Sequence, residues 1–259
     1  MPLLEYKHVS ISYDGVEAVH DVSCAVDAGE ICCLVGESGS GKSTLAHAAL
    51  GQLGDTGQLT SGEILFDGKS ILGMSQSELR GMRGSQMAIV FQDCLAHLTP
   101  IRKIGDQIFE SRRAHRNITR QQSDEEAIEL LAKLGLENPQ GVLASYPFNL
   151  SGGMGQRVGI AIALLAGPQI ILADEPTSAL DVISQAQVVD LFSKVRDVAG
   201  CGILFITHNI SIAQTLADTV CVMKAGEIIE QGSAKEVLER PSQDYTRALI
   251  ESLPRLKRK

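Results

Sequence analysis

The sequence has no excess of positive charge: 23 lysine and arginine residues stand against 31 aspartate and glutamate residues, which gives a net charge of -8. A chain with this balance is not built over its whole surface to hold nucleic acid or anionic lipid. Its hydrophobic content of 44% is that of an ordinary globular protein. We therefore expect no nucleic-acid partner.

Long apolar segments are also missing. The longest apolar run, GIAIALLAG, is interrupted by Pro168 before it reaches the length needed to span a bilayer. The N-terminus, MPLLEYKHVS, has no charged segment followed by a long apolar one, which a signal peptide requires. These absences predict a cytoplasmic chain that takes any membrane role from its partners.

Cysteine motifs for metal binding are absent as well. No two cysteines form a CxxC pair, and no Cys/His spacing suits zinc. We expect reduced thiols that are mostly buried as small apolar side chains. The cysteines are Cys24, Cys32, Cys33, Cys94, Cys201 and Cys221.

Three apolar runs predict buried parallel strands, because each is rich in β-branched residues and ends at a polar turn. They are ICCLV at 31–35, IILA at 170–173 and GILFIT, which ends at His208. Between the first two, the segment QQSDEEAIELLAKLGL has apolar residues at helical spacing, whereas SRRAHRNITRQQ is polar and is expected to be exposed. The chain thus predicts an α/β core with an inserted helical subdomain.

The C-terminal segment KAGEIIEQGSAKEVLERP predicts a hairpin followed by a capped helix. Gly226 and Gly232 are the expected turn residues.

The segment GESGSGKST lies between the apolar run ICCLV and the helix-like run LAHAALG. It fits the pattern GxxxxGK[ST], in which a strand leads into a glycine-rich loop and a helix begins near the lysine. Its glycines let backbone N–H groups point inward at a helix N-terminus, where phosphate is favoured. A flexible Gly/Ser turn would not need Lys42, suited to β- and γ-phosphates, or Ser43, suited to Mg²⁺. We expect a triphosphate cradle formed by Gly36, Ser38, Gly39, Gly41, Lys42, Ser43 and Thr44.

Polar side chains also follow the other predicted strands. Asp174 and Glu175 end the run IILADE, so Asp174 is expected to hold Mg²⁺ and Glu175 to polarise an attacking water. An isolated Asp-Glu pair is more often a solvated turn, but the preceding strand and the phosphate loop favour the functional interpretation. Gln92, after AIVF, is expected to sense the metal or the water, and His208 to hydrogen-bond the γ-phosphate.

The segment LSGGMGQR at 150–157 resembles the signature motif of ABC-type ATPases and precedes the Asp174 strand, as in that family. Further matches are Tyr13 at the adenine-stacking position, Gln92 in the Q-loop, SALD at 178–181 as the D-loop and His208 as the switch histidine. The resemblance implies a P-loop NTPase of the α/β class, with a RecA-like core and an inserted helical subdomain, that hydrolyses ATP with Mg²⁺.

In that family the signature residues begin a helix and form a second anion site over ATP held by another subunit. The resemblance thus assigns nucleotide contacts to Ser151, Gly152, Gly153 and Asp181. It implies catalytic roles for Glu175, His208 and Gln92, and metal contacts for Ser43, Gln92 and Asp174.

The stretches SGEILFDGKSILGMSQSELRGMRGSQMAIVFQD, LTPIRKIGDQI and RPSQDYTRALIESLP resemble ATPases of peptide and nickel importers. The resemblance implies one of two ATPase subunits, alike or homologous, bound to two permeases at the cytoplasmic face of the cell membrane, with a solute-binding protein as an indirect partner. The Q-loop and its neighbouring helices are expected to receive a permease helix. A soluble ABC ATPase without a transport role and an exporter ATPase are the alternatives, and the sequence leaves the solute open.

The resemblance implies a single ATPase domain over 1–259. Its RecA-like core is expected at 1–94 and 166–232, the helical signature subdomain at 95–165, and a C-terminal helix and tail at 233–259. Two basic clusters are expected to be solvated. They are Arg112, Arg113 and Arg116 in one, and Arg255, Lys257, Arg258 and Lys259 in the other.

Five positions depart from the subfamily's usual pattern. Cys94 stands where proline is common, and Asn209 replaces an aspartate after the switch histidine. If they are exposed, Gly155 and Gly159 are expected to weaken the helix after the signature by about 1 kcal/mol each relative to alanine. His97 lies in a stretch that is usually small or polar.

Overall fold

The computed structural model describes residues 1–178 and 180–252. The basic tail residues 255–259 and Ala179 of the expected D-loop therefore lie outside the described residues. The chain folds into two compact units: the first unit comprises Met1–Met74 and the segment from Gly202 onward, and the second unit comprises Ser75–Cys201. The second unit thus contains the expected helical segment 95–165 and flanking residues on both sides. The expected boundaries of the core and the helical subdomain stay a prediction.

A four-stranded antiparallel sheet forms one part of the first unit, in the strand order β2-β1-β4-β5. Asp14 and Gly15, with φ of 50° and 80°, join β1 to β2, which is typical of a tight hairpin turn. The strands are β1 (Leu4–Tyr13), β2 (Val16–Val26), β4 (Gly57–Phe66) and β5 (Lys69–Ser70).

Parallel strands form the other part of the first unit. Here β3 (Ile31–Val35) pairs in parallel with β8 (Gly202–Thr207) and with β9 (Thr219–Lys224). Every residue of β3 and β8 is buried, as expected for parallel strands covered on both faces. The predicted strands at ICCLV and GILFIT are confirmed. Helices α1 (Lys42–Ala49) and α8 (Ile210–Leu216) follow β3 and β8 in the chain.

The hairpin predicted near the C-terminus is present. Strand β10 (Glu227–Ser233) pairs antiparallel with β9 through a turn at Ala225 and Gly226, which both have positive φ. The prediction of a turn at Gly232 is wrong. Gly232 lies inside β10 and pairs with Val220, because the ladder continues to Ser233.

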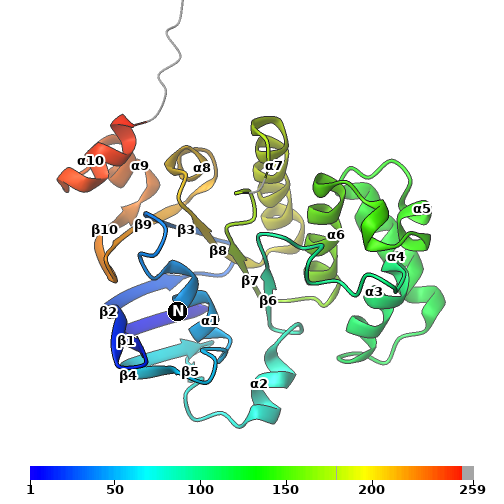
Figure 1. Ribbon diagram of the computed structural model, residues 1–259, viewed down its shortest axis with the longest axis horizontal. Helices are drawn as coiled ribbons and strands as arrows, with labels where there is room; N and C mark the ends of the chain where they lie inside the picture. Colours follow the sequence, from blue (N-terminus) through cyan, green and yellow to red (C-terminus); the bar gives the residue numbers. More distant parts are fainter. Residues whose placement is uncertain (179, 253–259) are drawn as a thin grey trace, which may run out of the picture. The chain divides into compact units, whose positions relative to one another are not determined.

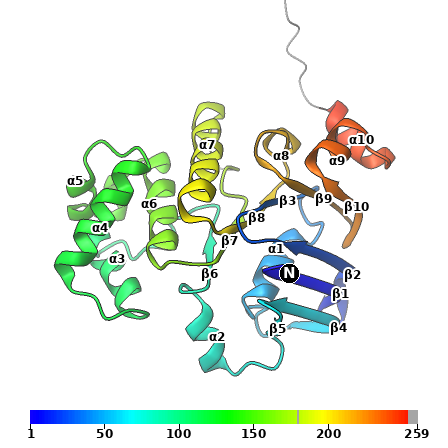
Figure 2. The ribbon, with the colours of Figure 1, turned by 180° about the vertical axis from the view of Figure 1, so that it is seen from behind.

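Two further helices follow this hairpin. Helix α9 (Ala234–Glu239) is the capped helix that the sequence predicts, and the structure shows that Ser233 and Glu236 form its capping box. Helix α10 (Asp244–Glu251) comes next. In both ribbon views α8, α9 and α10 lie side by side, with α9 next to β10 and α8 next to β3 (Figures 1 and 2).

In the second unit, β6 (Met87–Val90) and β7 (Ile170–Asp174) pair in parallel. The first four residues of β7, IILA, are buried, which confirms the predicted strand. Helix α6 (Gly152–Leu165) packs on β6, and α7 (Val182–Ala199) contacts α6. Helix α2 (Gln76–Met82) begins with a capping box of Ser75 and Glu78.

The remaining helices of the second unit lie together on one side of β6 (Figure 1). They are α3 (Ile104–Arg113), α4 (Arg120–Lys133), α5 (Pro139–Ala144) and the short 3₁₀ helix η1 (Pro147–Asn149). Thr119 and Gln122 form the capping box of α4, and this helix confirms the prediction from QQSDEEAIELLAKLGL.

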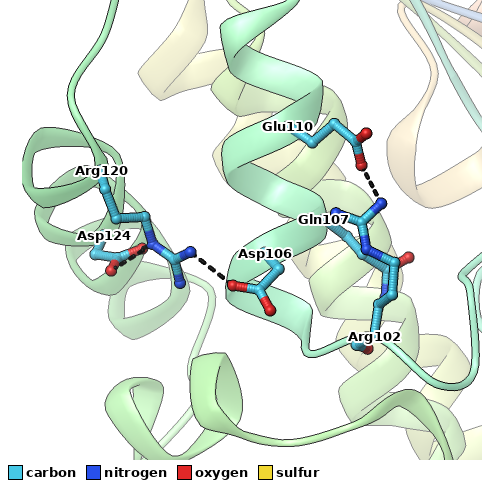
Figure 3. Close-up of polar contacts among 6 residues, drawn as sticks. All are labelled: Arg102, Asp106, Gln107, Glu110, Arg120 and Asp124. Carbon is cyan, nitrogen blue, oxygen red and sulfur yellow. Dashed lines mark hydrogen bonds and ion pairs between the residues drawn. The ribbon is translucent and has the colours of Figure 1, made fainter.

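Ion pairs connect α3 and α4 on the surface of this helical part (Figure 3). Arg120 donates from Nε to Asp124 of its own helix at 2.9 Å and from Nη1 to Asp106 of α3 at 2.6 Å. Arg102 pairs with Glu110 of α3. A cleft of about 560 Å³ beside these pairs is lined by Arg102, Asp106, Arg120 and Asp124, together with Ile101, Leu143 and Tyr146.

The prediction that Arg112, Arg113 and Arg116 are all solvated is wrong for Arg112. Its side chain is only 1% exposed and pairs with Glu126 of α4, and its Nη1 donates to the Ser123 carbonyl oxygen at 3.2 Å. The guanidinium is buried because it fills the interface between α3 and α4. Arg113 and Arg116 are exposed, as predicted.

All six cysteines are buried free thiols, as predicted. Among the described residues, no helix combines the length and the apolar character that a membrane span needs.

Candidate functional site: a phosphate loop and polar strand ends

The phosphate loop leads from β3 into α1, which begins at Lys42 as the sequence predicts. Two of its glycines are required by close packing. A Cβ added to Gly36 would lie 2.1 Å from the carbonyl oxygen of Met223. Gly41 has a φ of +100°, and a Cβ added there would lie 2.7 Å from the carbonyl oxygen of Ala18. The loop therefore curls tightly at the N-terminus of α1, where N–H groups favour an anion.

Lys42 lies inside this curl and is only 3% exposed. Its ammonium donates to the carbonyl oxygens of Gly36 at 2.9 Å and Glu37 at 2.6 Å, and to Ser40 Oγ at 3.3 Å. A buried cation with a helix N-terminus beside it creates a strongly positive site. This arrangement suits the phosphates of a nucleotide.

His208 lies at the same end of the parallel strands as the phosphate loop. Val35 of β3 is in register with Thr207 of β8, so Gly36 and His208 are the next residues on two neighbouring strands. His208 is exposed. Asn209 caps α8, because its side chain accepts a hydrogen bond from the Ser211 N–H at 3.0 Å. Asparagine serves as well as aspartate in this position, which explains the departure noted in the sequence.

Tyr13 ends β1 in the first unit and is half-buried. It pairs with Gly57 of β4, where an added Cβ would lie 2.7 Å from Tyr13 Cε1. Gly57 therefore leaves room for the ring. The adenine contact of Tyr13 stays a prediction.

In the second unit, polar residues follow the carboxyl ends of β6 and β7. Val90 of β6 is in parallel register with Ala173 of β7. Asp174 and Glu175 follow Ala173 directly, and Gln92 follows Val90 by two residues. The structure thus places Gln92, Asp174 and Glu175 at one carboxyl edge of this strand pair, where ligands of α/β proteins bind.

The backbone of Glu175 is left-handed, with a φ of 46°, a conformation that is rare for residues other than glycine. Such left-handed conformations cost about 1–2 kcal/mol and concentrate at functional sites. The carbonyl oxygen of Glu175 accepts hydrogen bonds from the Ser178 N–H at 3.2 Å and from the Ser178 hydroxyl at 3.0 Å. These bonds hold the strained turn, and the strain supports a functional role for the carboxylate.

The signature segment begins α6, as the sequence predicts. Ser151 is the N-cap, and its Oγ accepts a hydrogen bond from the Met154 N–H at 3.3 Å. Nothing lies within 4 Å of a Cβ added to Gly152 or Gly153. Ser151 and Gly152 are exposed. This open helix N-terminus is suited to an anion, and its role toward a second subunit stays a prediction.

The unusual glycines of α6 accommodate the unusual residues after Gln92. A Cβ added to Gly159 would lie 2.3 Å from Cys94 Sγ, and one added to Gly155 would lie 2.3 Å from Leu95 Cγ. The glycines therefore form two notches that receive Cys94 and Leu95. Burial raises the pKa of the Cys94 thiol to about 12, so the thiol is neutral and packs as an apolar group.

A hydrogen bond adds to this contact between the Q-loop and the signature helix. Gln156, which is 3% exposed, donates from Nε2 to the carbonyl oxygen of Phe91 at 3.4 Å. His97, another departure from the subfamily, stacks on Phe91 with ring centroids 3.9 Å apart. The segment around Gln92 is thus held against α6 from both ends.

Asp181 is the N-cap of α7. Its Oδ1 accepts hydrogen bonds from the N–H groups of Ile183 and Ser184, both at 3.0 Å, and Oδ2 accepts one from the Ser184 hydroxyl. The hydrogen bonds from Ser184 lower the pKa of this carboxyl. A nucleotide contact of Asp181 stays a prediction.

The residues present fit ATP with Mg²⁺. Mg²⁺ prefers oxygen ligands; in the first unit Ser43 offers a hydroxyl, and in the second unit Gln92 and Asp174 offer an amide oxygen and a carboxylate. The tight glycine packing and the buried Lys42 ammonium suit the phosphates.

Some contacts of the phosphate loop are not evident from its motif. The Glu37 N–H donates to the Tyr245 hydroxyl at 3.3 Å, and the Gly226 N–H donates to the Ser40 carbonyl oxygen at 3.1 Å. Tyr245 lies in the YTRALI run, which resembles the subfamily but does not by itself indicate this contact. Only the tertiary fold brings these residues together.

Comparison with protein families agrees with this geometry. A family model described as "ABC transporter" matches residues 19–178.

The chain is similar over nearly its whole length to two transport proteins. It is 40% identical over 256 residues to the oligopeptide transport ATP-binding protein OppD of Lactococcus lactis subsp. cremoris, and the aligned region covers 97% of this chain and 76% of the relative. It is 39% identical over 252 residues to the dipeptide transport ATP-binding protein DppD of Bacillus subtilis, and this alignment covers 96% of this chain and 75% of the relative.

A solved structure has the same fold. The ATP-binding cassette MJ0796, described as a dimer in a post-hydrolysis state bound to ADP and Pi, superposes with a TM-score of 0.77 at 28% identity. The match covers 89% of this chain and 98% of that one. Since the family match spans more than half of the chain and the relatives are similar over almost all of it, the protein belongs to the ATP-binding proteins of the ABC transporter family.

Proposed function

We propose that this chain is the ATP-hydrolysing subunit of an importer for peptides. The observation that carries the proposal is 40% identity, over 97% of the chain, to a protein described as an oligopeptide transport ATP-binding protein. A second relative is named for dipeptides. The relatives described above are named for peptides and not for nickel, so the proposal takes peptides as the cargo.

The proposed nucleotide contacts follow from the residues of the site. Lys42 binds the β- and γ-phosphates, and the loop N–H groups hold the remaining phosphate oxygens. Tyr13 stacks on adenine. The Mg²⁺ ligands are Ser43, Gln92 and, through water, Asp174. Their support is the buried ammonium of Lys42 and the oxygen donor set.

Glu175 is proposed to polarise the attacking water, and His208 to hydrogen-bond the γ-phosphate. The left-handed backbone of Glu175 supports this role, since such strain is maintained where a side chain must be aimed.

A second ATPase subunit, identical or homologous, is proposed to complete the site. Ser151, Gly152 and Gly153 at the open N-terminus of α6, together with Asp181, contact the ATP that the partner holds. The dimeric description of the related cassette supports this arrangement. ATP binding then closes the dimer, because these donors gain their ligand only when two subunits meet, and hydrolysis reopens it.

Two permease subunits are proposed to dock on the second unit, which places the chain at the cytoplasmic face of the membrane. The cleft of about 560 Å³ beside α3 offers Ile101, which is 84% exposed, next to Tyr146 and charged residues. An apolar anchor with a charged rim suits a short amphipathic helix. A solute-binding protein then contacts the permeases and not this chain.

Co-purification tests the proposal. The tagged chain is isolated from mildly solubilised membranes of its own cell and analysed by native mass spectrometry. We expect two membrane proteins and a second ATPase subunit. Ile101→Asp is expected to lose the membrane proteins while it keeps nucleotide binding, and the exposed Leu72→Asp serves as the control. Recovery of a soluble complex without membrane proteins would contradict the transport role.

Nucleotide binding is tested separately on the purified chain. Lys42→Ala is expected to lose ATP binding, because the buried ammonium is removed from the phosphate loop. Unchanged affinity in this variant would contradict the assignment of the loop.

A further inference from the structure

Helix α10 reaches the phosphate loop through one side chain, and both lie in the first unit. The Tyr245 hydroxyl accepts a hydrogen bond from the Glu37 N–H at 3.3 Å. The Glu37 carbonyl oxygen accepts hydrogen bonds from Lys42 Nζ at 2.6 Å and from the Ser40 N–H at 3.2 Å. Glu37, the second residue of the loop, is thus held on one side by α10 and on the other by the loop's own lysine.

The position of α10 is set by contacts away from the loop. Glu230 of β10 accepts hydrogen bonds from the Ser242 N–H at 2.6 Å, the Ser242 hydroxyl at 2.9 Å and the Gln243 N–H at 3.2 Å. Thr246 is fully buried. These contacts anchor the start of α10, so the neighbouring Tyr245 is presented from a fixed helix.

The ring of Tyr245 is oriented as well. The Lys224 ammonium lies 4.7 Å from its ring centroid, a favourable cation–π distance. Burial raises the pKa of the Tyr245 hydroxyl, which therefore keeps its proton at neutral pH. Lys224 directly follows Met223, whose carbonyl oxygen packs against Gly36. The β9–β10 hairpin and α10 therefore support the same stretch of the phosphate loop.

We propose that Tyr245 is a positioning residue for nucleotide binding, which acts by holding the Glu37 peptide of the phosphate loop in the orientation that binds ATP. The inference rests on the proposed nucleotide role of this loop. An anion nest binds tightly only when its N–H groups are ordered beforehand. Tyr245 restrains the first turn of the nest from outside, where it touches no reacting atom. Its loss therefore weakens binding and leaves the chemical step unchanged.

Tyr245→Phe in the full chain tests this role, because it removes only the hydroxyl and keeps the ring under Lys224. The dissociation constant for ATP with Mg²⁺ is measured by titration calorimetry, and kcat, KM and the melting temperature are measured in parallel. The loss of one hydrogen bond is expected to raise the dissociation constant and KM about three- to tenfold. We expect kcat to stay unchanged and the melting temperature to fall by only about 2–4 °C, the effect of losing one hydrogen bond. Glu251→Gln, an exposed change at the end of the same helix, is the control.

Tyr245→Leu removes the ring as well and is expected to weaken binding at least as much as Tyr245→Phe. Unchanged or tighter binding in both variants would overturn the proposal. A fall in kcat and melting temperature at unchanged KM would also overturn it, because it would indicate a purely structural role. If the unmodified chain binds no ATP, the proposed function fails. If it binds ATP and both variants bind equally well, only this inference fails.

Discussion

Replacing Gly159 with alanine tests whether the segment after Gln92 is held in the notches of α6. The added Cβ would lie 2.3 Å from Cys94 Sγ and 2.5 Å from Cys94 Cβ, whereas non-bonded carbon atoms favour about 3.5–4.0 Å. Overpacking a filled site costs about 1–3 kcal/mol. Alanine in a helix gains about 1 kcal/mol over glycine. Because the overlap exceeds 1 Å, we expect a net loss of about 1–2 kcal/mol of unfolding free energy.

The assay is urea-induced unfolding followed by far-UV circular dichroism, with the midpoints of both chains compared at equal m-value. Gly81→Ala is the matched control. Gly81 lies in α2 of the same unit, is exposed, and has nothing within 4 Å of an added Cβ. Without an overlap, this substitution is expected to stabilise the protein by up to about 1 kcal/mol.

A double-mutant cycle separates the contact from other effects. In the Cys94→Gly background the overlapping sulfur and Cβ are gone, so Gly159→Ala is expected to become neutral or stabilising. If Gly159→Ala stabilises the otherwise unmodified chain as Gly81→Ala does, the packing of Cys94 against α6 is refuted. A destabilisation that persists unchanged in the Cys94→Gly background would refute it too.

Three further predictions follow from the structure. Glu175→Gln is expected to bind ATP but to hydrolyse little of it, and native mass spectrometry is expected to show an ATP-bound dimer; normal turnover would contradict the role of Glu175. Arg112→Ala is expected to lose about 2–4 kcal/mol of stability in urea unfolding, because it empties a buried site and removes the closer of the two arginine partners of Glu126, leaving Arg116 at 3.7 Å; the exposed Arg113→Ala is the control, and an equal loss of stability in both variants would contradict the burial of Arg112. Burial alone would raise the pKa of Glu230, but the hydrogen bonds from the start of α10 lower it below its ordinary value. The ionised Glu230 carboxylate therefore stabilises α10 above about pH 4.5, and this stabilisation is lost as the pH falls through the lowered pKa. Hydrogen exchange at 244–251 is expected to accelerate in that acid range, and Glu230→Gln is expected to remove this pH dependence; the same pH dependence in the variant would show that another group controls it.

Local sequence was sufficient where the chemistry lies in consecutive residues. The phosphate loop needs a strand, three glycines, a lysine and the start of a helix within a few residues of one another, and α1 begins at Lys42 as predicted. The buried strands β3, β7 and β8 were predictable for the same reason, since a continuous apolar run already indicates burial on both faces.

Long-range packing decided the positions where sequence reasoning was wrong or incomplete. Arg112 was expected in solvent by its charge, but α4 lies across the interface, where Glu126 pairs with Nη2 of the buried guanidinium and the Ser123 carbonyl oxygen accepts a hydrogen bond from Nη1. Gly155 and Gly159 looked like weak points of a helix. Their reason is visible only when Cys94 and Leu95, more than 50 residues earlier in the chain, fill the space they leave.

By itself, the sequence determined the class of chemistry, because the phosphate loop, the acidic pair at 174–175 and the signature segment are each local patterns of a few residues. Tertiary structure alone decided what supports those patterns: the hairpin turn at Gly226 against Ser40, the hydroxyl of Tyr245 on Glu37, and the notches of α6. The physical reason is that a motif specifies which groups meet a ligand, whereas the contacts that hold those groups in place depend on which distant segments the folded core brings beside them.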